Sequence, residues 1–400
     1  MKPLEGIRVL DLSTFFAAPM CGRILADWGA EVIKVESPAG DPYRNSFKNQ
    51  KTPAFEAGCP SFDIENANKQ FICVDGKNPD GVEVIKKLAC TCDVFLTNNR
   101  YNALKKMGLT YEDIRAIKPS IVYGDMSGYG VEGPLKDKPG YDYTAFLSRS
   151  GILADLSAKD ESIMNTIGGF GDHVAAITLA SGIAAALVKA KTTGEGDHVY
   201  TALYQSAIFL VANGLNCAYF GREYPHTRFE SNGFLMTNYK CKDGEWIYLA
   251  SPEYNKFWGI ICKDVFKKPE LLEDERFATF DVGRLHVKEG VELLSKLFEQ
   301  EDSAHWVKLL DDAGVPFEKL AHFKDVLTDE QALVNKFVRP YTYASGEEVV
   351  VANTPVNFDS VPDTDFIPAG KIGADTQVVL ESLGYSTEEI TNFLDSGAVK

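Results

Sequence analysis

The sequence has few basic residues for its length. Among 400 residues, 41 are Lys or Arg and 57 are Asp or Glu, which gives a formal net charge of −16 at pH 7. Binding to a nucleic acid needs a concentrated basic surface. This excess of acid therefore argues against a nucleic-acid partner, although it leaves room for a local basic pocket that binds a small polyanion.

Long apolar runs are also missing. No uninterrupted apolar stretch reaches the roughly 18 residues that a membrane-spanning helix needs. The first residues, MKPLEGIRVLDLS, have neither the apolar region nor the cleavage site of a secretory signal. We therefore expect a cytoplasmic protein that does not associate with a membrane.

Patterns typical of metal, disulfide and nicotinamide sites are absent as well. The eight cysteines are scattered apart from the C-x-C of Cys90 and Cys92, and the six histidines have no metal-ligand spacing. We expect reduced thiols and no metal site. Glu36 stands where an acid would hold a ribose hydroxyl, but the segment DLSTFFAAPMCG lacks the G-x-G-x-x-G of a dinucleotide site. A dinucleotide dehydrogenase is therefore not expected.

Strand-like and helical segments alternate in the first part of the chain. Strands are predicted at 7–13 and 31–37 with a helix at 18–29 between them. Helices at 81–92 and 110–119, the second capped by Thr110, then alternate with strands at 93–99 and 121–128. This alternation predicts an α/β fold with a doubly wound, Rossmann-like parallel sheet.

The second half predicts a smaller α+β domain. A hairpin is expected at 239–251 with Asp243-Gly244 at its turn, and a charged helical region follows to about residue 320. Strand character returns at 347–358, and two helices close the chain, with Ser386 at the start of the second. We therefore predict a large domain at 1–224, a small domain at 225–325, and a segment at 326–400 that returns to the large domain.

One carboxylate stands in an unusual setting. In the stretch GGFGDHVAA, Asp172 follows Gly168, Gly169 and Gly171 and precedes a long run of small apolar residues. Asp is a preferred residue at a helix N-cap, which is one interpretation. Glycines also let another molecule approach the backbone, and a helix N-terminus favours the anionic carboxylate, so Asp172 is also a candidate nucleophile.

Two further groups of residues are candidates for binding. Gly140, Tyr141 and Asp142 lie in the glycine-rich segment SGYGVEGPLKDKPGYDYTAF, which is either a long surface connection or part of a site. Basic residues near predicted strand ends, where ligands of open α/β sheets bind, are either solvated surface charges or anion ligands. They are Lys69, Lys77, Arg100, Lys105 and Lys106.

Together these segments resemble a known family. The blocks AAPMCGRILADWGAEVIKVESPAGDPYR, NANK, PGYDYTA, GDH, KTTGEGDHV, DAGVPF and LGYSTEEI occur in the order seen in family III CoA-transferases, the group of formyl-CoA and carnitine CoA-transferases. The resemblance covers essentially the whole chain. It is strongest toward members acting on 2-hydroxy acids from amino-acid fermentation such as leucine degradation, among them 2-hydroxyisocaproate and phenyllactate. It implies an interlocked homodimer that uses CoA as a substrate and holds no permanent cofactor.

The resemblance also implies roles for individual residues. It makes Asp172 the covalent catalyst, with Phe16, Tyr141, Asp142, Gly168, Gly169 and Gly171 around the substrate and the oxyanion. Its CoA contacts fall on Ser37, Val74, Asp75, Gly76, Lys77, Asn98, Asn99, Arg100, Lys106 and Gly140. The chain departs from the formyl enzyme at Phe16, where that enzyme has a glutamine, and at Ala18, where the family has a glycine. Phe16 therefore predicts an apolar pocket for a branched or aromatic acid.

Two alternatives remain at this stage. The α-methylacyl-CoA racemases share the N-terminal blocks but use a histidine of a G-H-D segment, where this chain has Gly140-Tyr141-Asp142. A tyrosine with an ordinary pKa near 10 is a poor base at pH 7. A non-catalytic acyl-CoA-binding protein on the same fold would have no reason to keep an acid at position 172.

Overall fold

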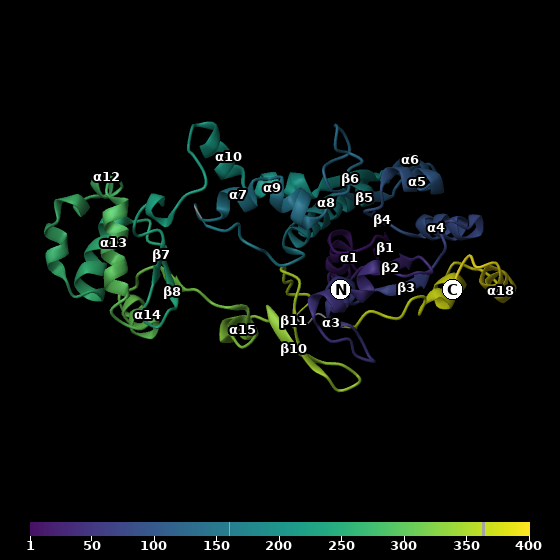
Figure 1. Ribbon diagram of the computed structural model, residues 1–400. Helices are drawn as coiled ribbons and strands as arrows, with labels where there is room; N and C mark the ends of the chain where they lie inside the picture. Colours follow the sequence, from purple (N-terminus) through teal and green to yellow (C-terminus); the bar gives the residue numbers. More distant parts are fainter. Residues whose placement is uncertain (160, 362–364) are drawn as a thin grey trace. The chain divides into compact units, whose positions relative to one another are not determined.

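The chain forms two compact units. The computed structural model describes residues 1–159, 161–361 and 365–400 (Figure 1). The first unit consists of Met1–Ile152, Asn165–Ala212 and Glu330–Lys400, and the second of Leu153–Met164 and Asn213–Asp329.

A six-stranded sheet is the centre of the first unit. Its order is β3 (Gln70–Cys73), β2 (Glu31–Glu36), β1 (Arg8–Leu12), β4 (Val94–Thr97), β5 (Val122–Ser127) and β6 (Asp197–Ala202). All neighbouring strands are parallel. The predicted doubly wound parallel sheet is thus confirmed, and the strand order reverses between β1 and β4, where ligands of such sheets bind.

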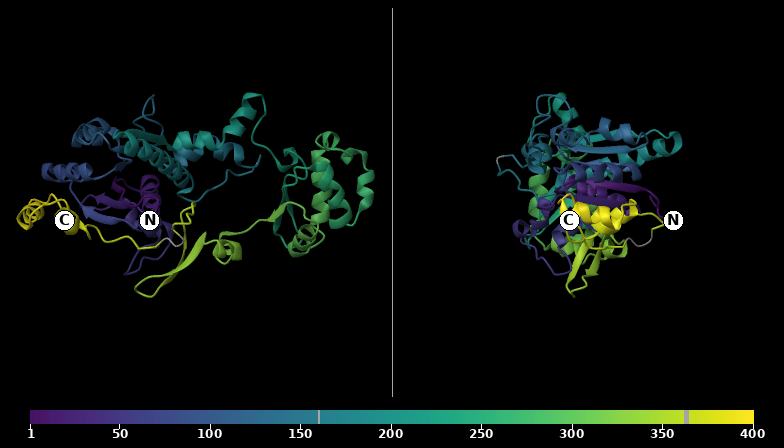
Figure 2. Two further views of the ribbon diagram at one scale, coloured as in Figure 1. Left: turned by 180° about the vertical axis from the view of Figure 1, so that it is seen from behind. Right: turned by 90° about the vertical axis from the view of Figure 1, so that its right-hand side faces the viewer.

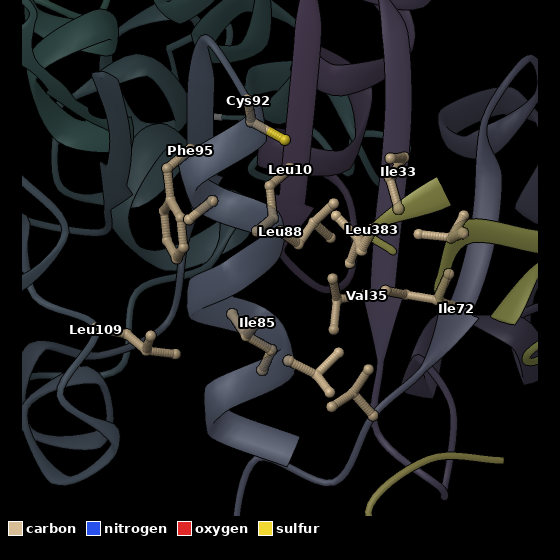
Figure 3. Close-up of a cluster of buried hydrophobic side chains, with 14 of the residues drawn as sticks. Leu10, Ile33, Val35, Ile72, Ile85, Leu88, Cys92, Phe95, Leu109 and Leu383 are labelled. Atoms are coloured by element: carbon tan, nitrogen blue, oxygen red, sulfur yellow. The ribbon is translucent and has the colours of Figure 1, made fainter. Parts of the chain in front are cut away.

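One face of the sheet buries an aliphatic and aromatic core. Leu10, Ile33 and Phe95 come from three neighbouring strands and pack against Ile85 and Leu88 of α4 (Pro79–Thr91) (Figure 3). Residues of α6 (Tyr111–Ile117), α17 (Thr376–Ser382) and α18 (Thr387–Asp395) join the same cluster. The last part of the sequence therefore completes the core built by the first.

The opposite face is covered by α1 (Ala17–Asp27) and α8 (Phe170–Thr193), which contact each other and the sheet. A Cβ on Gly124 of β5 would lie 2.8 Å from Ile183 of α8, so glycine is required for this close approach. The sequence-based expectation that no segment could span a membrane needs correction, because α8 is long and apolar enough by composition. Its burial against the sheet explains that composition as well as a membrane would, so the observation is weak evidence for one.

Shorter elements complete the first unit. They include the hairpin of β10 (Val338–Thr342) and β11 (Glu348–Ala352). The helices are α2 (Phe47–Gln50), α3 (Pro60–Asn66), α5 (Tyr101–Met107), α9 (Leu203–Leu210) and α16 (Glu330–Val334). At the C-terminus, Val399 forms an antiparallel bridge with Val74, and the Lys400 N–H donates to the Cys73 carbonyl. Helix α17 packs against β3, and Figure 2 shows the yellow C-terminal helices on the same unit as the purple N-terminal segment.

The second unit has its own core around a three-stranded antiparallel sheet of β7 (Asn238–Lys240), β8 (Trp246–Leu249) and β9 (Phe317–Lys319). The predicted hairpin is confirmed, with Gly244 at φ +90° in its turn. The helices of this unit are α11 (Tyr254–Ile260), α12 (Phe280–Gly283), α13 (Val287–Phe298), α14 (Ser303–Asp312) and α15 (Phe323–Val326). Helices α7 (Ile152–Leu156) and α10 (Ala212–Tyr219) begin at the last residues of first-unit segments.

Candidate active site

Asp172 lies in the first turn of α8, two residues inside the helix rather than at its cap. The helix begins at Phe170, and its N-cap is Gly169, whose φ of +86° is in the left-handed region that favours glycine. The interpretation of Asp172 as the N-cap is therefore wrong. Its carboxylate does not satisfy the first turn of the helix and is available for chemistry.

The group that caps this helix comes from a distant segment. Asp142 Oδ1 accepts a hydrogen bond from the Gly171 N–H at 2.9 Å. A Cβ on Gly171 would lie 2.6 Å from that oxygen and 2.2 Å from the Phe146 ring, so only glycine allows this approach. The Gly171 N–H is thus engaged by Asp142, and it can stabilise an oxyanion only if Asp142 releases it.

The Asp172 carboxyl group is buried, with 8% of the residue exposed. Its pKa is raised to about 7, because the effects of burial, of the neighbouring Asp142 and of Glu65 outweigh the lowering effect of His173. The helix N-terminus favours the anion by only roughly 0.3 to 1 kcal/mol, and burial acts on the pKa of Asp172 in the opposite direction. In the part of the chain that the structure describes, no hydrogen bond or ion pair ties the Asp172 carboxylate.

A carboxylate and a histidine form a pair next to Asp172. Glu65 of α3 places Oε1 3.2 Å from Nε2 of His173. The Glu65 side chain is 1% exposed, whereas that of His173 is 40% exposed. The charge and hydrogen bond of Glu65 raise the pKa of His173 above its ordinary value, although burial opposes this. Burial raises the pKa of Glu65 and His173 lowers it, so the contact favours the ionised pair while burial opposes it.

The loop Ser13–Phe16 follows β1 and carries the two phenylalanines of interest. Phe16 stacks at a tilt on Tyr43, with 4.2 Å between ring centroids, and a Cβ on Gly169 would lie 3.2 Å from its ring. Phe15 has φ +66° and meets the exposed Tyr141 edge to face. Phe16 is thus partly core and partly the wall next to the glycines that precede Asp172.

A cavity of about 880 Å³ opens at the carboxyl ends of β1, β2 and β3, and Asn99, which follows β4, also lines it. Ser13 and Thr14 line it, so the loop that carries Phe16 also borders the cavity. Most of the residues expected to contact CoA lie in its wall: Ser37, Val74, Asp75, Gly76, Lys77, Asn99 and Lys106. The cavity lies at the position where the strand order reverses, as expected for a ligand site of this fold.

Three of the expected contacts lie outside that wall. The Asn98 side chain donates to the Thr14 carbonyl at 2.7 Å and accepts from the Thr14 N–H at 3.0 Å, so it holds the loop after β1. Arg100 is exposed at the start of α5. A Cβ on Gly140 would lie 2.4 Å from the Gly128 Cα, so Gly140 serves a close backbone contact.

Lys69 is neither a surface charge nor a ligand of the cavity. Its Nζ is fully buried and donates to Asp11, Asn66 and the Pro19 carbonyl at 2.7 to 3.0 Å. Lys34 is likewise buried against Asp41 at 3.0 Å and donates to the Ser13 carbonyl at 2.8 Å. Since buried charges require partners, both lysines fix the backbone below the site. Glu36 lines the cavity, and its carboxylate is paired with Arg44 at 2.8 Å.

The sequence gives no sign of Glu65 as part of this site. It lies 108 residues before His173 on a short helix, and only the packing of α3 against α1 brings it there. Within residues 1–159, 161–361 and 365–400, no group of three or more His, Cys, Asp or Glu is arranged to hold a metal ion. All eight cysteines are free thiols.

The sequence matches a family model over most of its length. The model described as CoA-transferase family III matches residues 4–376. The (R)-2-hydroxy-4-methylpentanoate CoA-transferase of Clostridioides difficile is 43% identical over 99% of both chains. The cinnamoyl-CoA:phenyllactate CoA-transferase of Clostridium sporogenes is 35% identical over 96% of this chain and 94% of its own.

Solved structures agree with this likeness. A CAIB/BAIF family protein from Brucella suis superposes with a TM-score of 0.81 at 26% identity, covering 96% of this chain and 99% of its own. The similarity in sequence and in fold thus extends over both units.

Proposed function

Because the chain belongs to CoA-transferase family III, and is an enzyme that transfers CoA, we propose that it moves CoA from an acyl-CoA to a 2-hydroxy acid through Asp172. The preferred acceptor is 2-hydroxyisocaproate, which is 2-hydroxy-4-methylpentanoate, and phenyllactate is the alternative. The observation that carries the proposal is Asp172 itself: a buried carboxylate in the first turn of α8 that no described residue ties.

The chemistry runs through two half-reactions. The Asp172 carboxylate attacks the thioester carbonyl of the donor, which forms a mixed anhydride and releases CoA thiolate. The thiolate attacks the aspartyl carbonyl, giving an aspartyl-CoA thioester and the free donor acid. The acceptor carboxylate attacks this thioester and displaces the thiolate, which then attacks the acceptor's acyl carbonyl and frees Asp172. No proton is gained or lost overall.

The cavity next to the loop Ser13–Phe16 is proposed to bind CoA, as a substrate rather than a permanent cofactor. Lys77 and Lys106 supply cationic groups for its phosphates, and Val74, Pro79 and Met107 supply apolar surface. Fixed proximity between the bound thioester and Asp172 supplies much of the rate, since well-oriented intramolecular reactions reach effective molarities of about 10⁵ M or more.

The proposed enzyme is a cytoplasmic homodimer. Exposed apolar side chains on α8 and α9, namely Val188, Phe209 and Leu210, offer surface that a second copy would cover. Neither a nucleic acid nor a membrane is a proposed partner, in keeping with the net charge of −16 and with the burial of one side of α8.

A matrix of donors and acceptors tests this function. Purified enzyme is incubated with each of several acyl-CoAs and with 2-hydroxyisocaproate, phenyllactate, lactate or oxalate, and new CoA thioesters are identified by mass. The account predicts a 2-hydroxyacyl-CoA product. Exchange of the α-proton of a 2-methylacyl-CoA with deuterium oxide, without transfer, would show a racemase instead. Saturable acyl-CoA binding without either reaction would show a binding protein.

A further inference from the structure

The mechanism above assigns no task to the Glu65–His173 pair, although it stands beside the proposed nucleophile. His173 follows Asp172 directly in α8, and Glu65 reaches it from α3 at 3.2 Å. The second oxygen of Glu65, Oε2, is buried and has no hydrogen-bond partner among the described residues. A buried carboxylate held against a single histidine requires a reason, since desolvating a charge is costly.

Several neighbouring charged groups act on the two members of the pair. Asp142 and Asp172 act on His173 with the same sign as Glu65, while Lys69 acts on Glu65 from the side of α1 and β1. Burial and the negative charge of Glu65 also raise the pKa of the Tyr43 hydroxyl. On the pKa of Asp172, the lowering effect of the His173 charge is larger than the raising effect of the Glu65 charge. Nε2 of His173 also lies 3.5 Å from the position that a Cβ on Gly169 would take, so the paired ring lies beside the glycines that precede Asp172.

We propose that His173, held by Glu65, is a positioning residue whose positive charge faces the reacting carboxylate, first that of Asp172 and then that of the acceptor acid. This inference rests on the proposed function. It explains why an acid can react at a place where Asp142 and Glu65 would otherwise repel it.

Each of the two half-reactions begins with a carboxylate that the positive charge of His173 can face. When Asp172 becomes an aspartyl-CoA thioester, its negative charge leaves the site with the donor acid. The acceptor then brings one carboxylate back to the same place. One imidazolium thus faces one carboxylate before each attack, and the partly exposed ring of His173 next to Phe16 and Gly169 is within reach of an incoming acid.

The pH dependence of the first half-reaction tests the proposal. The rate of hydroxylamine trapping with acyl-CoA alone is measured from pH 5 to 9 for the wild type, His173→Gln and Glu65→Gln. Loss of the imidazolium raises the pKa of Asp172, so in His173→Gln the rise in rate moves to higher pH by roughly one unit or more. In Glu65→Gln both Asp172 and His173 lose a neighbouring anion, so the pKa values of both groups fall. The rise and the fall of the trapping rate with pH should therefore both move to lower pH.

The second half-reaction gives an independent readout. In His173→Gln the KM for the acceptor acid should increase at least about tenfold, while the KM for the donor acyl-CoA changes much less. A matched control is His286→Gln in the second unit, since His286 also pairs with a glutamate, Glu289, at 3.2 Å. That variant should keep the wild-type profile and both KM values.

The outcomes separate this inference from the proposed function. Opposite pH shifts in the two variants, each folded by its thermal unfolding curve, support it. A loss of rate that is equal at every pH in both variants, or unchanged profiles, would overturn it and leave Asp172 as the nucleophile. Absence of trapping and of transfer in the wild type itself would reject the proposed function instead.

Discussion

Asp142 Oδ1 and the Gly171 N–H, 29 residues apart in the sequence, form a 2.9 Å hydrogen bond at the start of α8. One carboxylate thus caps the helix that carries another, and the cap frees Asp172 from that structural task. The same closeness has an electrostatic effect, because the charge of Asp142 raises the pKa of Asp172. Asp142 therefore both stabilises the start of α8 and changes the protonation of Asp172.

Replacing Asp142 separates these two effects. Asp142→Asn keeps an oxygen that accepts from Gly171 but removes the charge, so the pKa of Asp172 falls from about 7 and activity persists to lower pH. Asp142→Ala removes the charge and the cap, and should also lower the free energy of unfolding by about 0.5–2 kcal/mol. pH profiles of kcat/KM and urea unfolding curves measure both. An acid limb that stays in place in both variants would contradict the electrostatic account.

Gly171 should tolerate no side chain. Gly171→Ala puts a Cβ 2.2 Å from the Phe146 ring, and overpacking of this kind costs about 1–3 kcal/mol. The matched control is Gly168→Ala, whose Cβ would meet only the Tyr143 hydroxyl at 3.5 Å. Thermal unfolding should show a loss for the first variant and little change for the second. Equal melting temperatures in the two variants would be evidence against the close contact of α8 with Phe146.

Two adjacent lysines test the CoA cavity. Lys106 lines it, and Lys105, also on α5 and also exposed, does not. A charged hydrogen bond contributes about 1.5–3 kcal/mol, so Lys106→Ala should raise the KM for acyl-CoA by roughly tenfold or more. Lys105→Ala should leave that KM within about twofold. Equal effects of the two substitutions would mean that CoA binds elsewhere.

Phe16 should set the choice of acceptor. Each buried methylene contributes about 0.8 kcal/mol, so an apolar wall favours 2-hydroxyisocaproate over lactate and oxalate in kcat/KM. Phe16→Gln should reduce that preference at least about tenfold, whereas Phe16→Leu should retain most of it. Equal kcat/KM values for all three acids in the wild type would reject the apolar pocket.

Features coded within a few residues were predictable from the sequence. The helix start at Thr110 was found because its side chain and Asp113 form a capping box four residues long, and Ser386 with Glu389 repeats the pattern. The strand predicted at 31–37 ends one residue earlier in the structure, as β2 (Glu31–Glu36). Such signals need no knowledge of tertiary contacts.

Features that depend on contacts between distant segments were not predictable from the sequence. The predicted cap at Asp172 failed because Asp142, from another segment, satisfies the helix and lets it begin at Phe170. The residues around Lys69 do not distinguish it from a surface lysine in the sequence. In the structure its side chain is buried and paired with Asp11. Glu65 has no local pattern at all, since its role depends on the packing of α3. Charge pairs between distant segments produce no periodicity or fixed spacing in the sequence, so sequence analysis does not detect them.

The covalent role of Asp172 has a direct test. The enzyme is incubated with acyl-CoA in the absence of acceptor, treated with hydroxylamine, digested and mapped by peptide mass, with Asp172→Asn as the control. The account predicts a hydroxamate on Asp172 in the wild type only, with loss of transfer activity in step with the modification. An Asp172 that stays unmodified while activity is lost, or an Asp172→Asn variant within about tenfold of wild-type activity, a barrier change of only ~1.4 kcal/mol, would contradict it.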